Sequence, residues 1–171
     1  LKEKKFDIDS VVDLRNKTFV TIDGKSAKDF DDAVLGEKDE EGNLILYVAI
    51  ADVGRYIDKG SCLDQEALER GTSVYFSQRV IPMLPEVLSN DLCSLKPNED
   101  RFCLVCKTTV DSEGNLSGTS FFEAIINSKS RLTYGTVTRE VERKQFKKPY
   151  DHSLKILLEI YNRLKSNRSQ R

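Results

Sequence analysis

Four aspartates stand within ten residues near the start of the chain, and this crowding constrains the local fold more than any other feature. They are Asp23, Asp29, Asp31 and Asp32. Such close carboxylates repel one another, and this repulsion destabilises a surface loop unless a divalent cation supplies the opposing charge. In an extended segment Asp29 and Asp31 share one face and Asp32 takes the other, whereas Asp23 joins them only if the chain folds back. The spacing predicts a strand end followed by an irregular loop.

The donor atoms indicate which ion such a site would hold. The run from Thr21 to Ala33 offers carboxylate oxygens and contains no His or Cys, which suits a hard cation, Mg²⁺ or Mn²⁺. A calcium loop fits poorly, because counting from Asp23 its pattern fails at positions 3, 5 and 6. The alternative is a solvated acidic turn, since Gly, Lys, Ser and Asp are ordinary loop residues.

The aspartates belong to a series of motifs that stand in a fixed order along the chain. The motifs are Asp13-Leu14-Arg15, Thr21-Ile22-Asp23, Asp29-Phe30-Asp31-Asp32-Ala33, Val48-Ala49-Ile50-Ala51-Asp52-Val53, Gly60-Ser61, Leu63-Asp64, Arg70-Gly71-Thr72-Ser73-Val74-Tyr75-Phe76, Ile81-Pro82-Met83-Leu84-Pro85-Glu86, Leu88-Ser89-Asn90, Leu92-Cys93-Ser94-Leu95 and Arg131-Leu132-Thr133-Tyr134. In this order and at these distances they closely resemble the catalytic (RNB) domain of the RNase II / RNase R exoribonuclease family. The resemblance spans roughly residues 13 to 138, and its Asp-Phe-Asp-Asp-Ala motif is most similar to the bacterial RNase R branch.

The resemblance implies a 3′→5′ exoribonuclease that degrades single-stranded RNA processively to nucleoside 5′-monophosphates. Hydrolysis of a phosphodiester needs a deprotonated water, in-line attack and relief of charge on the leaving oxygen, which a pair of cations can provide. Carried over by motif position, Asp23, Asp29 and Asp32 are expected to be ligands of Mg²⁺, with Mn²⁺ as a substitute. Asp31 is expected to be the acid most directly needed for catalysis, near the terminal nucleotide.

Tyr75 is the second kind of site that the resemblance implies. In the Thr-Ser-Val-Tyr-Phe segment the family places an aromatic residue that stacks on the nucleotide at the 3′ end. Stacking tolerates any base, as an enzyme without sequence preference requires. From the residues alone, the favoured interpretation is that Tyr75 and Phe76 are ordinary strand residues with one of the two in the core.

Two other function classes stay open. One is a non-catalytic RNA-binding relative, although retention of all four aspartates argues against degeneration. The other is a different metal-dependent phosphodiesterase, acting for instance on DNA. The family domain continues beyond residue 171, where it supplies a catalytic arginine and a second stacking aromatic, and oligonucleotide-binding barrels flank it. Residues 1–171 are therefore expected to be the N-terminal part of one RNB catalytic domain and to be inactive alone.

The hydrophobic pattern predicts an α+β fold with antiparallel hairpins flanked by helices. A β-rich stretch covers 19–23, and 33–35 leads through a polar turn into 44–51. Two further strands, 102–110 and 116–126, are joined at 111–115. A helix follows Ser61-Cys62-Leu63-Asp64, which is similar to a capping box, and Gly71 ends it. After Asp151 or Ser153 comes an amphipathic helix whose expected core stripe is Leu154, Leu157, Leu158, Tyr161 and Leu164. Residues 1–5 and 165–171 read as linker-like.

Cysteine usage, together with the lack of a membrane-span or signal-peptide pattern, predicts a cytoplasmic protein. The four cysteines are expected to be buried free thiols in a reducing compartment, and Cys103 and Cys106 fall on opposite faces of a strand rather than forming half a zinc site. No apolar run has the length of a membrane span, and no signal peptide is recognisable.

Residues 139–171 hold ten Lys/Arg against four Asp/Glu, yet the net charge of the whole chain is −1. Such weak overall charge predicts that much of the RNA-binding surface lies outside residues 1–171.

Overall fold

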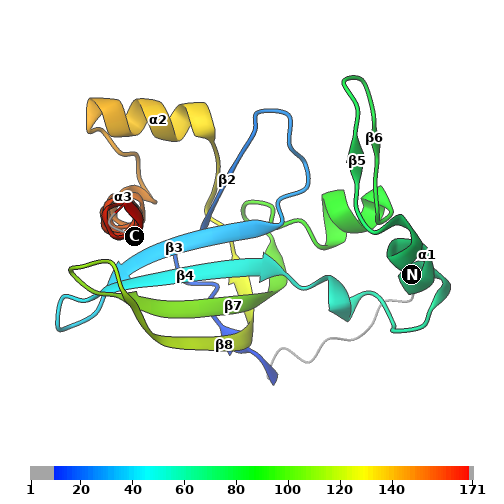
Figure 1. Cartoon of the computed structure of the whole chain (residues 1–171), viewed down its shortest axis with the longest axis horizontal. Coiled ribbons are helices and arrows are strands. Elements are labelled where there is room, and N and C mark those ends of the chain that lie inside the picture. Colours follow the sequence, from blue (N-terminus) through cyan, green and yellow to red (C-terminus); the bar gives the residue numbers. More distant parts are fainter. Residues whose placement is uncertain (1–9, 170–171) are drawn as a thin grey trace.

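The computed structural model describes residues 10–169, and their main feature is a seven-stranded sheet (Figure 1). The sheet strands are β1 (Val12–Asp13), β2 (Val20–Asp23), β3 (Asp32–Lys38), β4 (Leu44–Ala51), β7 (Asp100–Val110), β8 (Leu116–Asn127) and β9 (Ser130–Thr133). Across the sheet their order is β1-β8-β7-β4-β3-β2-β9. The remaining elements are the hairpin strands β5 (Val74–Tyr75) and β6 (Val80–Ile81) and the helices α1 (Cys62–Arg70), α2 (Tyr134–Arg143) and α3 (Asp151–Ser169). The predicted α+β class with flanking helices is confirmed.

Two predicted hairpins form the centre of the sheet. β3 and β4 pair antiparallel around residues 39–43, where the Asp39 carboxylate accepts two backbone hydrogen bonds. β7 and β8 pair around residues 111–115, where the Asp111 carboxylate does the same. An aspartate at the first position of a turn favours this local bonding over strand continuation. Both hairpins are confirmed, and β3 runs longer than its apolar stretch because polar residues continue the backbone ladder.

The outer strands differ from the predicted antiparallel pairing. β2 pairs antiparallel with β3 but parallel with β9, and β1 pairs parallel with β8. β9 has four residues and β1 has two, so neither is long enough to leave a periodic hydrophobic signal. Their places at the sheet edges come from the path of the intervening chain.

Apolar side chains are buried on both faces of the sheet. On one face the strands pack against the chain before β2, the β2–β3 loop and a single π-helical turn, η3 (Leu88–Leu92). The largest fully buried residues there are Phe19, Leu35, Leu88, Leu95, Val105 and Ile126. On the other face α3 lies across the strands and is seen almost end-on in Figure 1. The aspartates lie away from α3, at the other end of β3.

The predicted core stripe of α3 is confirmed in part. Leu154 is buried as predicted, and Leu157 and Leu164 pack against the core. Tyr161, also a predicted core residue, is 55% exposed, and the other buried residues of the helix are Ser153, Ile156 and Ile160. Gly36 on β3 explains the difference. A Cβ at this position would lie 2.9 Å from Cγ2 of Ile156, and the Gly36 N–H donates to Ser153 Oγ at 3.1 Å. The glycine lets α3 approach through its Ser153 side, which turns Tyr161 outward.

α3 continues through Ser169, so the linker-like prediction is wrong for residues 165–169. The Asn167 side chain donates to the Glu113 carbonyl at 3.0 Å and to Asn115 Oδ1 at 3.0 Å. These contacts fix the last turns of the helix on the β7–β8 turn. Residues 1–5 and 170–171 lie outside the described residues.

α1 and the β5–β6 hairpin follow β4 and stand beside the main sheet (Figure 1). Ser61 Oγ accepts from the Asp64 N–H at 3.2 Å, and the Asp64 carboxylate reaches back to the Gly60 N–H at 2.7 Å. The helix ends at Gly71, whose φ of 68° is the left-handed conformation that glycine adopts without a steric penalty. The predicted cap and end of this helix are both confirmed.

The four cysteines are unpaired, and two of them are core residues. Cys93 and Cys103 are buried, Cys106 is half-buried, and Cys62 at the start of α1 is exposed, so the prediction of buried thiols is wrong for Cys62. Burial raises the pKa of the Cys103 thiol to about 12, which keeps it protonated.

Among residues 10–169, no helix combines the length and apolar character that crossing a membrane requires.

Candidate active site

The four aspartates gather at one end of the sheet. Asp23 is the last residue of β2, Asp32 is the first of β3, and the connecting loop, residues 24–31, carries the other two. β4 ends beside them, because the Ala51 N–H donates to the Asp31 carbonyl at 2.8 Å. The chain folds back between β2 and β3 as the spacing requires. We call residues 24–31 the acidic loop.

Phe30 anchors the acidic loop between two of its aspartates. Its side chain is only 8% exposed and belongs to the core, and its carbonyl accepts a hydrogen bond from the Leu95 N–H at 2.9 Å. With Phe30 held inward, the extended backbone directs Asp29 and Asp31 outward, and both line the same cavity. Asp32 is exposed and does not line that cavity, as the alternation predicts.

Ser94 fixes the backbone on both sides of Asp29. Its fully buried hydroxyl accepts from the Phe30 N–H at 3.0 Å and donates to the Lys28 carbonyl at 2.9 Å. One side chain thus satisfies two polar groups of a loop that has no strand partner at this point. The sequence places Ser94 in a motif but gives no sign of this contact, which depends on η3 packing beneath the loop.

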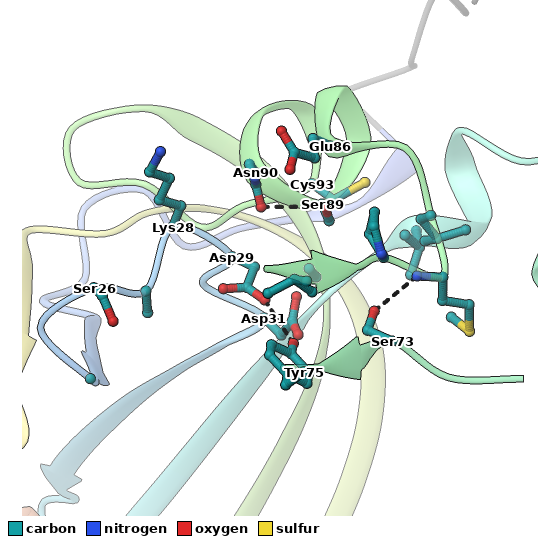
Figure 2. A pocket seen from close by; sticks show the side chains of 18 of the residues that line it. Ser26, Lys28, Asp29, Asp31, Ser73, Tyr75, Glu86, Ser89, Asn90 and Cys93 are labelled. Atoms are coloured by element: carbon teal, nitrogen blue, oxygen red, sulfur yellow. Dashed lines mark hydrogen bonds between the residues drawn. The ribbon is translucent and has the colours of Figure 1, made fainter. Parts of the chain in front are cut away.

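A cavity of about 680 Å³ lies in front of Asp29 and Asp31 (Figure 2). Tyr75, from β5, joins its wall, and the Tyr75 hydroxyl donates to Asp29 Oδ2 at 3.3 Å. Three predicted site residues therefore meet at one cavity. Asp23, half-buried beneath the loop, and Asp32 do not line it. Polar lining residues that sequence reasoning missed are Ser26, Lys28, Ser73, Glu86, Ser89 and Asn90.

Tyr75 is a surface residue. Its side chain is 68% exposed and that of Phe76 is 53% exposed, so the alternative that one of the pair lies in the core is wrong. The hairpin that carries Tyr75 is a separate sheet of two strands and stands beside the main sheet (Figure 1). The Asp29 charge raises the pKa of Tyr75, so the hydroxyl keeps its proton and can donate to that carboxylate.

The crowded carboxylates change one another's ionisation. Asp31 is exposed at the cavity, yet desolvation by the cavity walls raises its pKa, and the charges of Asp29, Asp32 and Asp23 raise it further. Burial likewise raises the pKa of Asp23, helped by the charges of Asp32 and Asp29. These shifts mean that the ionised cluster is electrostatically unfavourable in the folded protein.

The donor set fits a hard cation. Within residues 10–169, no three carboxylate, imidazole or thiol groups already converge tightly enough to hold a metal ion. The chemistry nevertheless suits one, because the four acids are oxygen donors and Asp23 Oδ2 is buried and has no hydrogen-bond partner among the residues that the structure describes. A buried anionic oxygen with no donor is costly, and a cation is the kind of group that would satisfy it.

Asp52, to which the sequence assigned no role, belongs to an ion-pair network beside the cavity. Its carboxylate accepts from Arg55 Nε at 2.8 Å, and Arg55 also pairs with the carboxylate of Glu123 on β8. The Arg55 guanidinium lies 4.5 Å from the centre of the Phe102 ring. The network ties the short 3-10 turn η2 (Val53–Arg55) to the sheet, and Asp52 is one of its members.

Known proteins are similar to this chain in both sequence and fold. Residues 11–171 match the family model described as the RNB domain. Ribonuclease R of Escherichia coli strain K12 is 53% identical over 152 residues, which are 88% of this chain and 19% of that protein. The chain spans about a fifth of the length of the curated relatives that it matches.

Solved structures extend the comparison. Mycoplasma genitalium RNase R, in complex with ribose methylated single-stranded RNA, superposes with a TM-score of 0.90 at 33% identity, covering 98% of this chain and 27% of that one. Yeast Ssd1, described as a pseudonuclease, superposes with a TM-score of 0.77 at 21% identity, covering 91% of this chain and 19% of that one. The second likeness is one of fold alone.

Proposed function

The chain belongs to the RNB-domain family, and on that premise we propose that the complete protein is a 3′→5′ exoribonuclease that degrades single-stranded RNA processively to nucleoside 5′-monophosphates. The observation that carries the proposal is the cavity in which Asp29 and Asp31 face an exposed aromatic ring, that of Tyr75. Acidic groups for phosphate chemistry and a stacking surface for a base are thereby within reach of one terminal nucleotide. The RNA-bound relative supports the substrate class.

Each site residue has a separate task in this proposal. Asp23, Asp29 and Asp32 would hold Mg²⁺ or Mn²⁺, which when bound would supply an activated water and positive charge for the phosphate. Asp31 would accept, at its carboxylate, the proton that the attacking water loses as its oxygen bonds to phosphorus, a task for which a raised pKa is an advantage. The Tyr75 ring stacks on the base, while its hydroxyl holds Asp29 in place through the hydrogen bond to Oδ2.

Two alternatives share the fold. A non-catalytic RNA-binding protein is one, since the fold also occurs in a pseudonuclease, but this chain keeps all four aspartates. A phosphodiesterase acting on DNA is the other.

A nuclease assay on the complete protein separates the three functions. Matched RNA and DNA oligomers, labelled at the 5′ end, are incubated with and without Mg²⁺. We expect stepwise shortening of RNA from the 3′ end that requires the cation, with DNA left intact. RNA binding without shortening would support the non-catalytic relative, and equal degradation of DNA would support the other phosphodiesterase.

We expect the double substitution Asp23→Asn with Asp32→Asn to weaken Mn²⁺ binding by more than about tenfold, because affinity for a hard cation follows the charge of its ligands. Calorimetry on the complete protein with RNA bound measures the change. The control removes two carboxylates elsewhere, Glu66→Gln with Glu69→Gln on the exposed side of α1, and should leave binding unchanged. Equal affinity in both double variants would show that the aspartates are not the ligands.

We expect Tyr75→Ala to change the size of the final undegraded oligonucleotide more than the rate on long RNA. Long substrates keep many other contacts, whereas a short end-product depends on the few stacked nucleotides near the aspartates, at about 1–3 kcal/mol per stacked base. Tyr75→Phe is the matched control, since it keeps the ring and loses only the hydrogen bond to Asp29. High-resolution gels measure the length of the end-products. An unchanged length in the alanine variant would show that Tyr75 does not bind the RNA.

A further inference from the structure

Arg131 reaches the acidic loop from the strand next to β2. It lies on β9, which pairs in parallel with β2 so that Arg131 is level with Thr21. From there its guanidinium extends past the end of β2, and Nη2 donates to the Gly24 carbonyl at 2.8 Å and to the Lys25 carbonyl at 2.7 Å. These are the first two residues after Asp23, so Arg131 binds the acidic loop where it leaves the sheet.

The same guanidinium also touches the middle of the loop. Its central carbon lies 5.5 Å from the centre of the Phe30 ring, within the range of a cation–π contact. Arg131 Nε is buried and has no hydrogen-bond partner in the part of the chain that the structure describes. A buried donor left unpaired is destabilising, so packing alone does not explain an arginine here. A methionine or leucine would fill the space without that penalty.

Together with Ser94, Arg131 holds the acidic loop at both ends. Ser94 binds the backbone at residues 28 and 30, and Arg131 binds it at residues 24 and 25. The loop between these contacts is irregular and has to keep like charges close together. Without external hydrogen bonds, repulsion among its carboxylates would spread it.

We propose that Arg131 is a positioning residue that latches the acidic loop to β9 and so fixes Asp29 and Asp31 relative to Asp23. The latch is a property of the folded chain, and its effect on catalysis rests on the proposed function. It gives the Arg131-Leu132-Thr133-Tyr134 motif a physical task. One nitrogen, Nη2, donates to both neighbouring carbonyls, and the rigid plane of the guanidinium fixes the direction of its N–H groups, which a freely rotating ammonium group does not.

Hydrogen exchange on the complete, metal-free protein tests the latch directly. We expect Arg131→Met to raise amide exchange in peptides covering residues 24–31 by about tenfold or more, with β4 and β7 unaffected. Arg131→Lys should fall between wild type and Arg131→Met, because lysine keeps the charge and the donors but lacks the rigid plane of the guanidinium. The matched control is Arg139→Met, which removes an exposed arginine whose hydrogen bond stays within α2.

A second measurement links the latch to the site. In the RNA assay we expect Arg131→Met to raise the Mg²⁺ concentration for half-maximal activity by about tenfold, in the range found when residues supporting metal ligands are removed. Saturating Mg²⁺ should restore most of kcat, since the acids themselves are intact. A merely structural residue would lower the amount of active protein without moving the Mg²⁺ requirement.

The outcomes separate the latch from the proposed function. Local exchange that rises in Arg131→Met supports the latch even if the wild-type protein degrades no RNA, in which case the proposed function alone fails. Exchange and Mg²⁺ requirement that match those of Arg139→Met would overturn the latch. If Arg131→Met exchanges throughout the sheet, Arg131→Lys decides: loosening confined to residues 24–31 supports the latch, and uniform loosening overturns it.

Discussion

Asp31→Asn in the complete protein is expected to lower kcat by about 10²–10³-fold or more, while the affinity for RNA stays close to that of wild type. The substitution keeps the size of the side chain and removes a charge that acts on the reacting phosphate, which is the kind of interaction that matters most in the transition state. Affinity for a long strand comes from stacking and backbone contacts spread over many nucleotides. Single-turnover rates and equilibrium binding measure the two quantities separately.

The stability of the same variant provides an internal check. The pKa of Asp31 is raised in the folded protein, so its ionised form opposes folding and its contribution to stability is largest below the ordinary carboxyl pKa. That contribution is lost as the pH rises through the raised value. In the metal-free protein at pH 7, Asp31→Asn should therefore melt at the same temperature as wild type or higher. A lower melting temperature together with weakened RNA binding would point to misfolding, and the catalytic assignment of Asp31 would lose its support.

Phe30→Ala is expected to lower the free energy of unfolding by about 3–5 kcal/mol, the usual effect of truncating a buried phenylalanine to alanine. The ring is 8% exposed and packs in the core directly below Asp29 and Asp31. Removing it leaves a cavity and also frees the loop that both aspartates need. In calorimetry of the complete protein, the transition that includes this domain should fall by about 6–20 °C.

Phe121→Ala is the matched control for that experiment. Phe121 lies on β8 and is 69% exposed, so its truncation should change stability by no more than about 0.5 kcal/mol. Equal losses in the two variants would mean that Phe30 is no special anchor. A loss of stability confined to Phe30→Ala, accompanied by lower activity below the melting transition, would support the inference that Phe30 anchors the acidic loop.

The sequence by itself determined the central hairpins, the α+β class and the acidic end of the sheet. Alternating apolar residues are a local signal, and the turns around Asp39 and Asp111 are made by hydrogen bonds within five residues. The crowding of Asp29 and Asp31 is also local, because residues two apart in extended backbone share a face whatever surrounds them. Motif order gave the family, whose model matches residues 11–171.

Only the tertiary structure decided which groups support the aspartates. Ser94 and Arg131 lie far along the chain from the acidic loop and leave no periodic pattern near it, so their hydrogen bonds appear only when η3 and β9 pack beside β2 and β3. The same reason explains why Tyr161 is exposed: the side of α3 that is buried depends on the close approach at Gly36, a property of two surfaces and of neither sequence segment alone.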